Sequence, residues 1–303
     1  DVKMAKLIEI TGKALSGEWG TDDETGNGIP VLRTTNFTNE GIVDYSNVVT
    51  RNIVKKGIEE KYLRNGDIII EKSGGSDKQP VGRVIYFDGP EHTYLFNNFT
   101  GLLRVKNQEK WHPRYVFYSL FTNYRSGGTR TFQNKTTGLH NLKTDDYVSS
   151  FNVTEIDIAT QEAICKKLDL VSGIIRMHQK QLQKLDDLVK ARFVEMFGDM
   201  LLNDMTWQES TLDTLADVVS GITKGRKIRE TELIEVPYMA VSNVKDGYID
   251  WTTVKTIMAT KQEIEQYRLL PYDVLMTEGG DPDKLGRGSV ITKPLKNSIH
   301  QNH

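Results

Sequence analysis

The stretch IATQEAICKKLDLVSGIIRMHQKQLQKLDDLVKARFVEMF, from Ile158 to Phe197, contains no proline and a single glycine, Gly173. Its apolar residues recur at alternating spacings of four and three, which is the heptad pattern of a coiled-coil helix. About 40 residues at ~1.5 Å each predict a helical rod of roughly 60 Å. Gly198 follows the stretch and is a typical C-terminal stop for a helix.

One apolar seam runs along this predicted helix and requires a partner helix to cover it. We therefore expect self-association through the seam, or packing against an equivalent helix. The single polar member, His178, is interpreted as a register device or a partner contact rather than a metal ligand, because no His/Cys cluster surrounds it. The seam positions are Leu168, Val171, Ile175, His178, Leu182, Leu185 and Val189.

The segments on either side of this helix repeat each other. IPVLRTTNFTNEGIVDY begins at Ile29 and is matched by VPYMAVSNVKDGYIDW from Val236; GDIIIEKSGGSDK begins at Gly66 and is matched by YDVLMTEGGDPDK from Tyr272. The matches keep one order along the chain, which indicates two diverged copies of one domain. The matched positions are Pro30 with Pro237, Asn36 with Asn243, Asp44 with Asp250, Asp67 with Asp273, Gly74-Gly75 with Gly279-Gly280, and Gly82-Arg83 with Gly286-Arg287.

Each copy is predicted to be rich in β-strands. Short β-branched runs bounded by Gly, Asn and Asp give expected strands at 29–33, 67–70, 82–87 and 101–105, and spaced aromatic residues predict a helix over 111–124. The expected class is α+β, with two homologous β-rich modules joined by a long coiled-coil-type helix. The predicted domains are 1–153, the spacer helix 154–199, and a second module 200–303 that we expect to be incomplete, since the first copy continues further.

Composition argues against a disulfide-bonded, membrane-spanning or secreted protein. The 303 residues carry a net charge of −2, and one cysteine, Cys165, excludes an intrachain disulfide. Mean hydropathy is −0.46, no apolar run approaches the ~18 residues of a membrane span, and no signal peptide opens the sequence. We therefore expect a cytoplasmic protein without a membrane partner. A DNA-binding protein this acidic must cluster its cations or share phosphate contacts with a partner.

The residues from Val148 to Asp199, VSSFNVTEIDIATQEAICKKLDLVSGIIRMHQKQLQKLDDLVKARFVEMFGD, resemble the central conserved region of the specificity (S) subunit of type I restriction-modification systems. In particular, LDDLVKARFVEMFGD is similar to the end of that family's helix, and Gln161-Glu162 to the pair that opens it. Ala159 and Thr160 stand where the family commonly has prolines. The blocks IPVLRTTN and GDIIIEKSG resemble strands of its target recognition domains.

This resemblance implies a DNA-recognition subunit that is not itself catalytic. Each copy would be a target recognition domain that reads one half of a split sequence in double-stranded DNA, with the helix fixing the gap. The helices would dock methyltransferase (M) subunits, which bind S-adenosylmethionine and methylate adenine N6. A restriction/translocase (R) subunit would use ATP. The chain would bind no cofactor or metal of its own.

Candidate DNA contacts are amides, cations, hydroxyls and glycines in loops that follow predicted strands. Each position also has a structural alternative: a solvated loop, a hairpin, or, for the paired Arg83 and Arg287, an ion pair. Residues shared by both copies favour framework or phosphate roles, and residues that differ favour sequence choice. The candidates are Arg33, Asn36, Lys72, Ser73, Gly74, Gly75, Lys78, Arg83, Arg125, Arg130, Asn134, Lys135 and Thr137 in the first copy and Lys224, Arg226, Lys227, Asn243, Thr277, Lys284 and Arg287 in the second.

Other functions fit the sequence less well. A two-module scaffold that binds protein or glycan ligands and dimerises through its helix explains the acidic charge and the seam, but not the resemblance. The recognition subunit of another multisubunit methylation system is a further alternative. Asp67 with Glu71-Lys72 only superficially resembles a nuclease core, and the sequence has neither an Asn-Pro-Pro-Tyr motif nor a phosphate-binding Gly-Lys-Ser/Thr loop.

Overall fold

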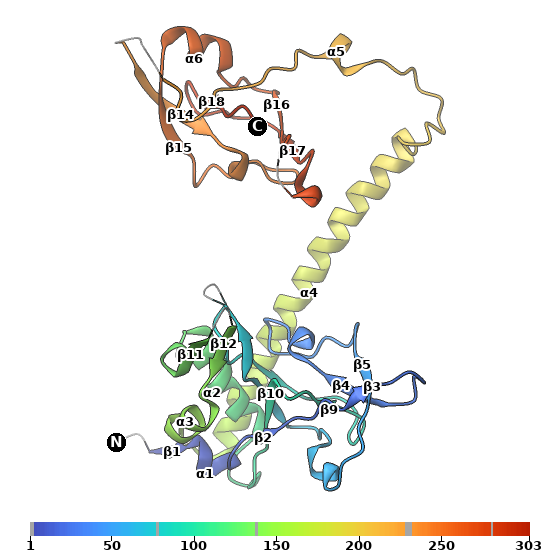
Figure 1. Cartoon of the computed structure of the whole chain (residues 1–303), viewed down its shortest axis with the longest axis vertical. Helices are drawn as coiled ribbons and strands as arrows, with labels where there is room; N and C mark the ends of the chain where they lie inside the picture. Colours follow the sequence, from blue (N-terminus) through green and yellow to red (C-terminus); the bar gives the residue numbers. More distant parts are fainter. Residues whose placement is uncertain (1–2, 77–78, 137–138, 228–231, 280) are drawn as a thin grey trace. The chain divides into compact units, whose positions relative to one another are not determined.

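The computed structural model describes residues 3–76, 79–136, 139–227, 232–279 and 281–303. Its contacts divide the chain into unit 1 (Asp1–Phe193) and unit 2 (Val194–His303). The chain has the expected α+β class, with β-rich regions and one long helix (Figure 1).

Unit 1 holds most of the secondary structure. Its strands are β1 (Met4–Lys6), β2 (Leu15–Ser16), β3 (Thr21–Asp22), β4 (Ile29–Leu32), β5 (Val49–Asn52), β6 (Ile68–Glu71), β7 (Ser73–Gly75), β8 (Val84–Tyr86), β9 (Leu95–Phe96), β10 (Thr100–Leu103), β11 (Gln133–Thr136), β12 (Leu139–Leu142) and β13 (Asn152–Thr154). Its helices are α1 (Leu7–Thr11), α2 (Pro113–Arg125), α3 (Thr144–Ser150) and most of α4 (Ile158–Phe197), with 3-10 turns η1 (Thr34–Asn36), η2 (Ile58–Lys61) and η3 (Arg130–Phe132).

Unit 2 contains a smaller set of elements. They are β14 (Ile234–Met239), β15 (Lys255–Ala259), β16 (Val274–Met276), β17 (Gly288–Val290), β18 (Ile299–His300), α5 (Leu212–Leu215), α6 (Lys261–Tyr267), and the 3-10 turns η4 (Val241–Asn243) and η5 (Pro282–Lys284). Helix α6 begins with a capping box in which Thr260 Oγ1 accepts the Glu263 N–H at 3.1 Å.

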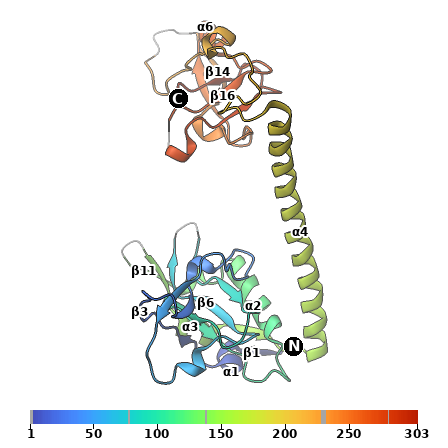
Figure 2. The same cartoon turned by 90° about the vertical axis from the view of Figure 1, so that its right-hand side faces the viewer.

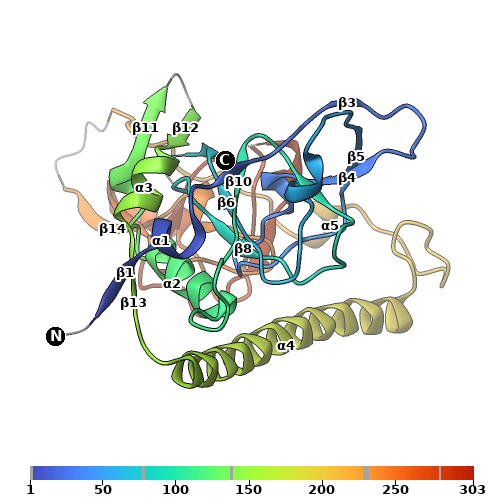
Figure 3. The same ribbon diagram turned by 90° about the horizontal axis from the view of Figure 1, so that it is seen from below.

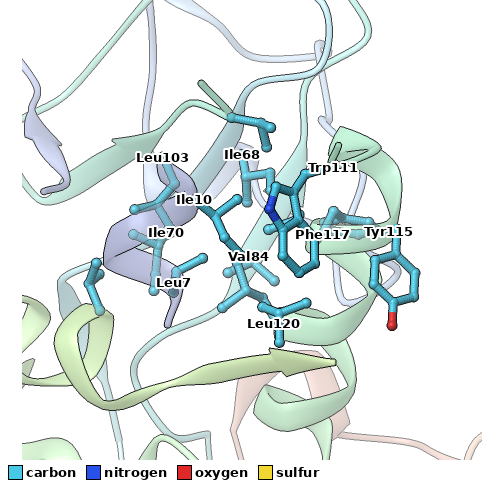
Figure 4. Close-up of a cluster of buried hydrophobic side chains, with 14 of the residues drawn as sticks. Leu7, Ile10, Ile68, Ile70, Val84, Leu103, Trp111, Tyr115, Phe117 and Leu120 are labelled. Atoms are coloured by element: carbon cyan, nitrogen blue, oxygen red, sulfur yellow. The ribbon is translucent and has the colours of Figure 1, made fainter. Parts of the chain in front are cut away.

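Strand β6 organises the core of unit 1 because both of its faces are buried. The unit's sheets have the strand orders β2-β10-β6-β8, β3-β5-β4-β9, β11-β12-β7 and β1-β13. Ile68 and Ile70 pack on one side of β6 with α1 and α2, and Ile69 packs on the other side with β4 and β9. Figure 4 shows the first cluster, with Trp111 and Leu120 among its members. A strand buried on both faces has no polar alternation, which explains the run of three isoleucines.

The two copies share one strand arrangement. In unit 1, β4 pairs antiparallel with β5 and parallel with β9. In unit 2, β14 pairs antiparallel with β15 and parallel with β18. The pairs β6–β8 and β16–β17 are both antiparallel. The internal repeat seen in the sequence is therefore confirmed as a repeated fold.

A buried asparagine closes the same turn in each copy. Asn36 is 2% exposed; its Oδ1 accepts the Arg33 N–H at 2.9 Å, and its Nδ2 donates to the carbonyls of Asp44 at 2.9 Å and Asn47 at 3.0 Å. Asn243 is 1% exposed and holds the Ala240 N–H and the Asp250 carbonyl in the same way, both at 3.0 Å. These amides satisfy backbone groups that the turns leave unpaired.

Helix α4 runs from Ile158 to Phe197, inside the predicted spacer 154–199, whose first residue Thr154 ends strand β13 instead; the first turns of α4 pack on the rest of unit 1. Its first turns carry Gln161, Cys165 and Asp169, four residues apart and therefore on one face. Gln161 is fully buried, its Oε1 accepts the His112 N–H at 2.8 Å, and its Nε2 donates to the carbonyls of Lys110 and Ile156. One side chain thus joins the start of α4 to the start of α2.

An ion pair continues this attachment about two turns further along α4. Asp169 Oδ1 accepts hydrogen bonds from Arg114 Nε at 2.8 Å and from the Tyr118 hydroxyl at 2.5 Å, both on α2. The Arg114 guanidinium also lies 4.4 Å from the centroid of the Tyr86 ring. Figures 2 and 3 show α4 as one continuous helix. It ends at Phe197, where Gly198 adopts φ +75° as expected for a helix stop.

The predicted seam is exposed beyond this attachment. Leu168 is 39% exposed, Leu182 is 63% exposed and Val189 is 70% exposed. Val171, Ile175, His178 and Leu185 are exposed as well. A row of exposed apolar side chains of this length is unusual for an isolated surface, so the expectation that another helix covers it stays a prediction.

Replacing Gly173 by Ala should stabilise α4. Gly173 lies inside the helix, and a Cβ there meets no atom within 4 Å, so alanine gains helix propensity without a clash. We expect a gain of about 1 kcal/mol, measured by urea unfolding followed by circular dichroism at the helix band. Gly198→Ala is the matched control and should destabilise, because its φ is +75° and its Cβ would lie 2.0 Å from Asp204 Oδ1. Equal effects of the two changes would contradict this account.

Replacing Asn36 by Ala should destabilise unit 1 by about 2–4 kcal/mol, because it strands one buried N–H and two carbonyls. The midpoint of urea unfolding, read from tryptophan fluorescence, measures the loss. Asn27→Ala, at an exposed position, should change it by less than about 0.5 kcal/mol. A similar midpoint for both variants would show that the turn does not depend on the Asn36 amide.

Candidate nucleic-acid interface

Candidates from two loops of the first copy lie on one three-stranded sheet of unit 1. Strand β7 carries Ser73, Gly74 and Gly75 and joins β12 and β11 in one sheet. This sheet unites two loops that lie far apart in the sequence, 72–78 and 124–137. Figures 1 and 3 show β11 and β12 projecting from the body of the unit. Lys78 and Thr137 lie outside the described residues, and of Lys135 only the backbone, in β11, is described.

The two glycines of β7 are explained by backbone geometry. The pairing of β7 with β12 runs from Asn141 opposite Ser73 to His140 opposite Gly75, which leaves Gly74 as a bulge. Gly74 has φ +128°, a region that favours glycine. A Cβ on Gly75 would lie 2.4 Å from the Val81 backbone nitrogen. Both positions therefore exclude larger residues, whatever they bind.

Arg83 is used inside the fold. Its guanidinium makes two hydrogen bonds to Glu71, at 3.2 and 3.0 Å, and donates to the carbonyls of Phe37 at 3.0 Å and Thr34 at 3.1 Å. The Glu71 side chain is only 2% exposed. This buried ion pair connects η1 to strands β6 and β8. Arg83 therefore has the structural role, an ion pair, that was considered for it as the alternative to DNA contact.

Two other candidates near this edge are partly engaged. Lys72 Nζ donates to Ser16 Oγ at 2.9 Å, and burial lowers the pKa of its ammonium group. Arg33 donates from one guanidinium nitrogen to the Asn47 carbonyl at 3.3 Å, while its buried Nε has no partner among the described residues. Arg33 follows directly after β4, and Ala240 occupies the equivalent position after β14. The two turns are otherwise similar, so this position is one at which the two copies differ.

The segment between α2 and β11 is anchored at one point and cationic around it. Thr129 is fully buried and donates to the Val81 carbonyl at 2.8 Å. The side chains of Arg125 and Arg130 are exposed and make no hydrogen bond or ion pair with the part of the chain that the structure describes. Asn134, on β11, is exposed too. These three side chains face solvent on a backbone that Thr129 holds in place.

The candidates of the second copy also divide into side chains that are bonded inside the fold and side chains that are exposed. Arg226 makes two hydrogen bonds of 2.7 Å to Glu263, and this pairing lowers the pKa of the Glu263 carboxyl. Lys224 and Lys227, on either side, are exposed. Asn243 is the buried framework amide already described.

The loop after β16 differs from its counterpart in unit 1. The Thr277 N–H donates to the Arg287 carbonyl as the Glu71 N–H does to Arg83, so a threonine stands where unit 1 has its buried carboxylate. Thr277 Oγ1 donates to the Lys284 carbonyl at 2.8 Å, and the Lys284 ammonium group pairs with Asp281. Arg287 is half-buried. The strand framework is therefore repeated, but the Arg–Glu pair is not.

Other chemistry is sparse in the described residues. They contain no group of three His, Cys, Asp or Glu side chains that could hold a metal ion. The Cys165 thiol is buried against unit 1, and desolvation raises its pKa to about 11, so its reactive thiolate form is scarce at neutral pH. Within the described parts, no helix is both long and apolar enough to cross a membrane.

The attachment of α4 was missed in the sequence. Gln161 and Asp169 were not candidates, although their spacing of four residues around Cys165 marks a second helix face beside the seam. That face differs from the seam in carrying polar side chains between apolar ones. It positions the helix relative to the strands of unit 1.

Comparisons with known proteins agree on one family. The profile of the type I restriction modification DNA specificity domain matches residues 1–187. The type I restriction-modification system S subunit from M. genitalium is similar in structure, with a TM-score of 0.51 at 12% identity over 100% of this chain and 71% of that chain. A second structure, on complex assembly and conformational transition of the type I R-M system, gives 0.52 at 12% identity over 99% and 73%. No curated protein matches the sequence.

Some candidate arginines are paired inside the fold and others are exposed. Replacing a paired arginine should lower the free energy of unfolding much more than replacing an exposed one. Arg83→Ala leaves the Glu71 carboxylate buried without its partner, so we expect unit 1 to lose about 3 kcal/mol. Arg130→Ala removes an exposed side chain and should change stability by less than about 0.5 kcal/mol. Urea unfolding of both variants measures the difference, and an equally small effect of Arg83→Ala would contradict the framework role.

Proposed function

The chain belongs to the family of type I restriction modification DNA specificity domains, and we propose that its two β-rich modules each recognise one half of a split DNA sequence. The observation that carries this proposal is the repeated module on either side of α4. Both copies keep the buried asparagine and the same strand pairing, while the exposed side chains around them differ. One framework with two sets of exposed residues suits a protein that reads two different half-sites.

The exposed cations are the proposed phosphate contacts. They are Arg125 and Arg130 in unit 1 and Lys224 and Lys227 in unit 2. Arg83 and Arg226 are committed to carboxylates in the fold, and Asn36 and Asn243 to backbone groups, so their contribution to DNA binding is to hold the backbone in shape. These four candidate cations, in a chain of net charge −2, would make a small electrostatic contribution to DNA binding. Partner subunits would therefore share the phosphate contact.

The partners follow from the family and from the exposed seam of α4. Methyltransferase subunits would dock along the helices, bind S-adenosylmethionine and methylate adenine N6. A restriction/translocase subunit would hydrolyse ATP. The chain itself would be non-catalytic, and its helix would fix the number of unread base pairs between the half-sites. A DNA-recognition role and a chain with one cysteine, Cys165, suit a reducing cytoplasm.

Methylation sequencing tests this function directly. The protein is co-expressed with its methyltransferase partner, and genomic DNA is sequenced by a single-molecule method that detects N6-methyladenine. We expect a two-part motif with a fixed gap, because the proposed spacer helix sets the separation of the half-sites that two modules of one chain can bind. The motif should vanish when the chain is omitted.

The control for that experiment is partner expression without the chain, verified by immunoblot. If both proteins are present and no methylated motif appears, the DNA-recognition function is wrong and a scaffold protein is favoured. Binding of the purified complex to motif DNA should also weaken steeply with salt. Binding that is independent of salt would contradict phosphate contact by the exposed cations.

A further inference from the structure

A row of polar side chains crosses the projecting sheet of unit 1. In the antiparallel pair β11–β12, Asn134 lies directly opposite Asn141, and on the other side of β12 Asn141 lies opposite Ser73 of β7. Direct partners in an antiparallel sheet point their side chains to the same face. Two amides and one hydroxyl therefore stand side by side across three strands. Asn141 was not a candidate in the sequence.

The burial pattern shows that this face is the outer one. His140 and Leu142, which flank Asn141 on β12, are 8% and 7% exposed, and Leu142 belongs to the main hydrophobic core. Because side chains alternate along a strand, Asn141 points away from that core. Asn134 is exposed, and Asn141 and Ser73 are partly exposed. The row therefore faces outward from the unit.

The strands beneath the row are held firmly. On the inner face, Gln133 Oε1 lies 2.9 Å from His140 Nδ1. The Leu142 N–H donates to the Lys72 carbonyl at 2.8 Å, and the Lys143 N–H donates to the Phe132 carbonyl at 2.8 Å. Strands are better platforms than loops for side chains that must meet a ligand in one geometry.

Two adjacent amides on the outer face of a three-stranded sheet, next to its β11 edge, match one kind of ligand. The major groove of B-DNA admits a two-stranded β-ribbon, and β11 with β12 forms such a pair at the open edge of this sheet. An asparagine amide can accept from the N6 amino group of adenine through Oδ1 and donate to N7 through Nδ2, a pairing that no other base offers in the same pattern. Arg130, in the turn that leads into β11, is exposed and can contact the phosphates that flank the groove.

We propose that the β11–β12 ribbon enters the major groove and that Asn134 and Asn141 recognise adenine in the half-site of unit 1. This proposal rests on the proposed function of the chain. The ribbon supplies the specificity-determining side chains, whereas the buried amide of Asn36 holds the framework. Ser73 completes the row as a hydroxyl that can bond to any base.

Single substitutions test the assignment in the co-expression experiment. Asn134→Ala and Asn141→Ala should each relax the requirement for adenine at one position of the methylated motif by about tenfold. The other positions of that half-site, the gap and the second half-site should stay as they are. Asn152→Ala is the matched control, since Asn152 is an exposed asparagine on β13 of the same unit, and it should leave the motif unchanged.

A binding measurement covers the case in which a variant abolishes methylation. A set of duplexes is made in which one adenine of the motif at a time is replaced by 7-deazaadenine. Each duplex then lacks the N7 acceptor at a single position. The complex with the wild-type chain should lose about tenfold in affinity at the adenine that is recognised, and the complex with Asn141→Ala or Asn134→Ala should show no further loss there.

The outcomes separate the two proposals. If the wild-type chain directs no methylation, the proposed function fails. If the wild-type motif is present but both alanine variants keep every adenine requirement, the ribbon assignment is overturned and the function stands. Wild-type binding that tolerates 7-deazaadenine at every position would overturn the assignment as well.

Discussion

The fold of each β-rich module depends on one buried amide. Asn36 and Asn243 close the turn that follows the central strand of their sheets, and each does so by bonding backbone groups before and after the turn. A buried amide that satisfies several backbone groups is costly to replace, since each stranded group loses its hydrogen bond. The turn therefore stays the same in both copies while the residues around it differ.

Unit 1 also separates buried framework positions from exposed ones. Glycines at a bulge and at close backbone approaches, the buried pair of Arg83 and Glu71, and the doubly buried strand β6 form the fixed part of unit 1. Exposed side chains on β11 and β12 and in the preceding turn lie outside this framework. Binding specificity can change on such a framework without cost to stability, because exposed substitutions are nearly neutral.

The long helix α4 also has a buried, fixed part and an exposed part. Its first turns are fixed to unit 1 by Gln161 and by the pairing of Asp169 with Arg114, so the helix leaves the unit from a defined attachment. Beyond these turns the side chains of the seam are exposed, and we expect another helix to cover them. A helix of 40 residues that is attached at its start and apolar along one side is suited to connecting recognition modules and to assembly with other subunits.

The sequence by itself determined the helix, the repeat, the α+β class and the family, because heptad spacing and matched blocks are local patterns that survive without tertiary information. It also marked the loops that form the projecting edge of unit 1. Only the tertiary structure decided which candidates face solvent, since burial and pairing join residues far apart in the chain. Arg83 meets Glu71, Asn36 meets the Asp44 carbonyl, and Asn134 meets Asn141. Strand register sets the last of these pairs, and a shift of one residue would turn both amides to the opposite face.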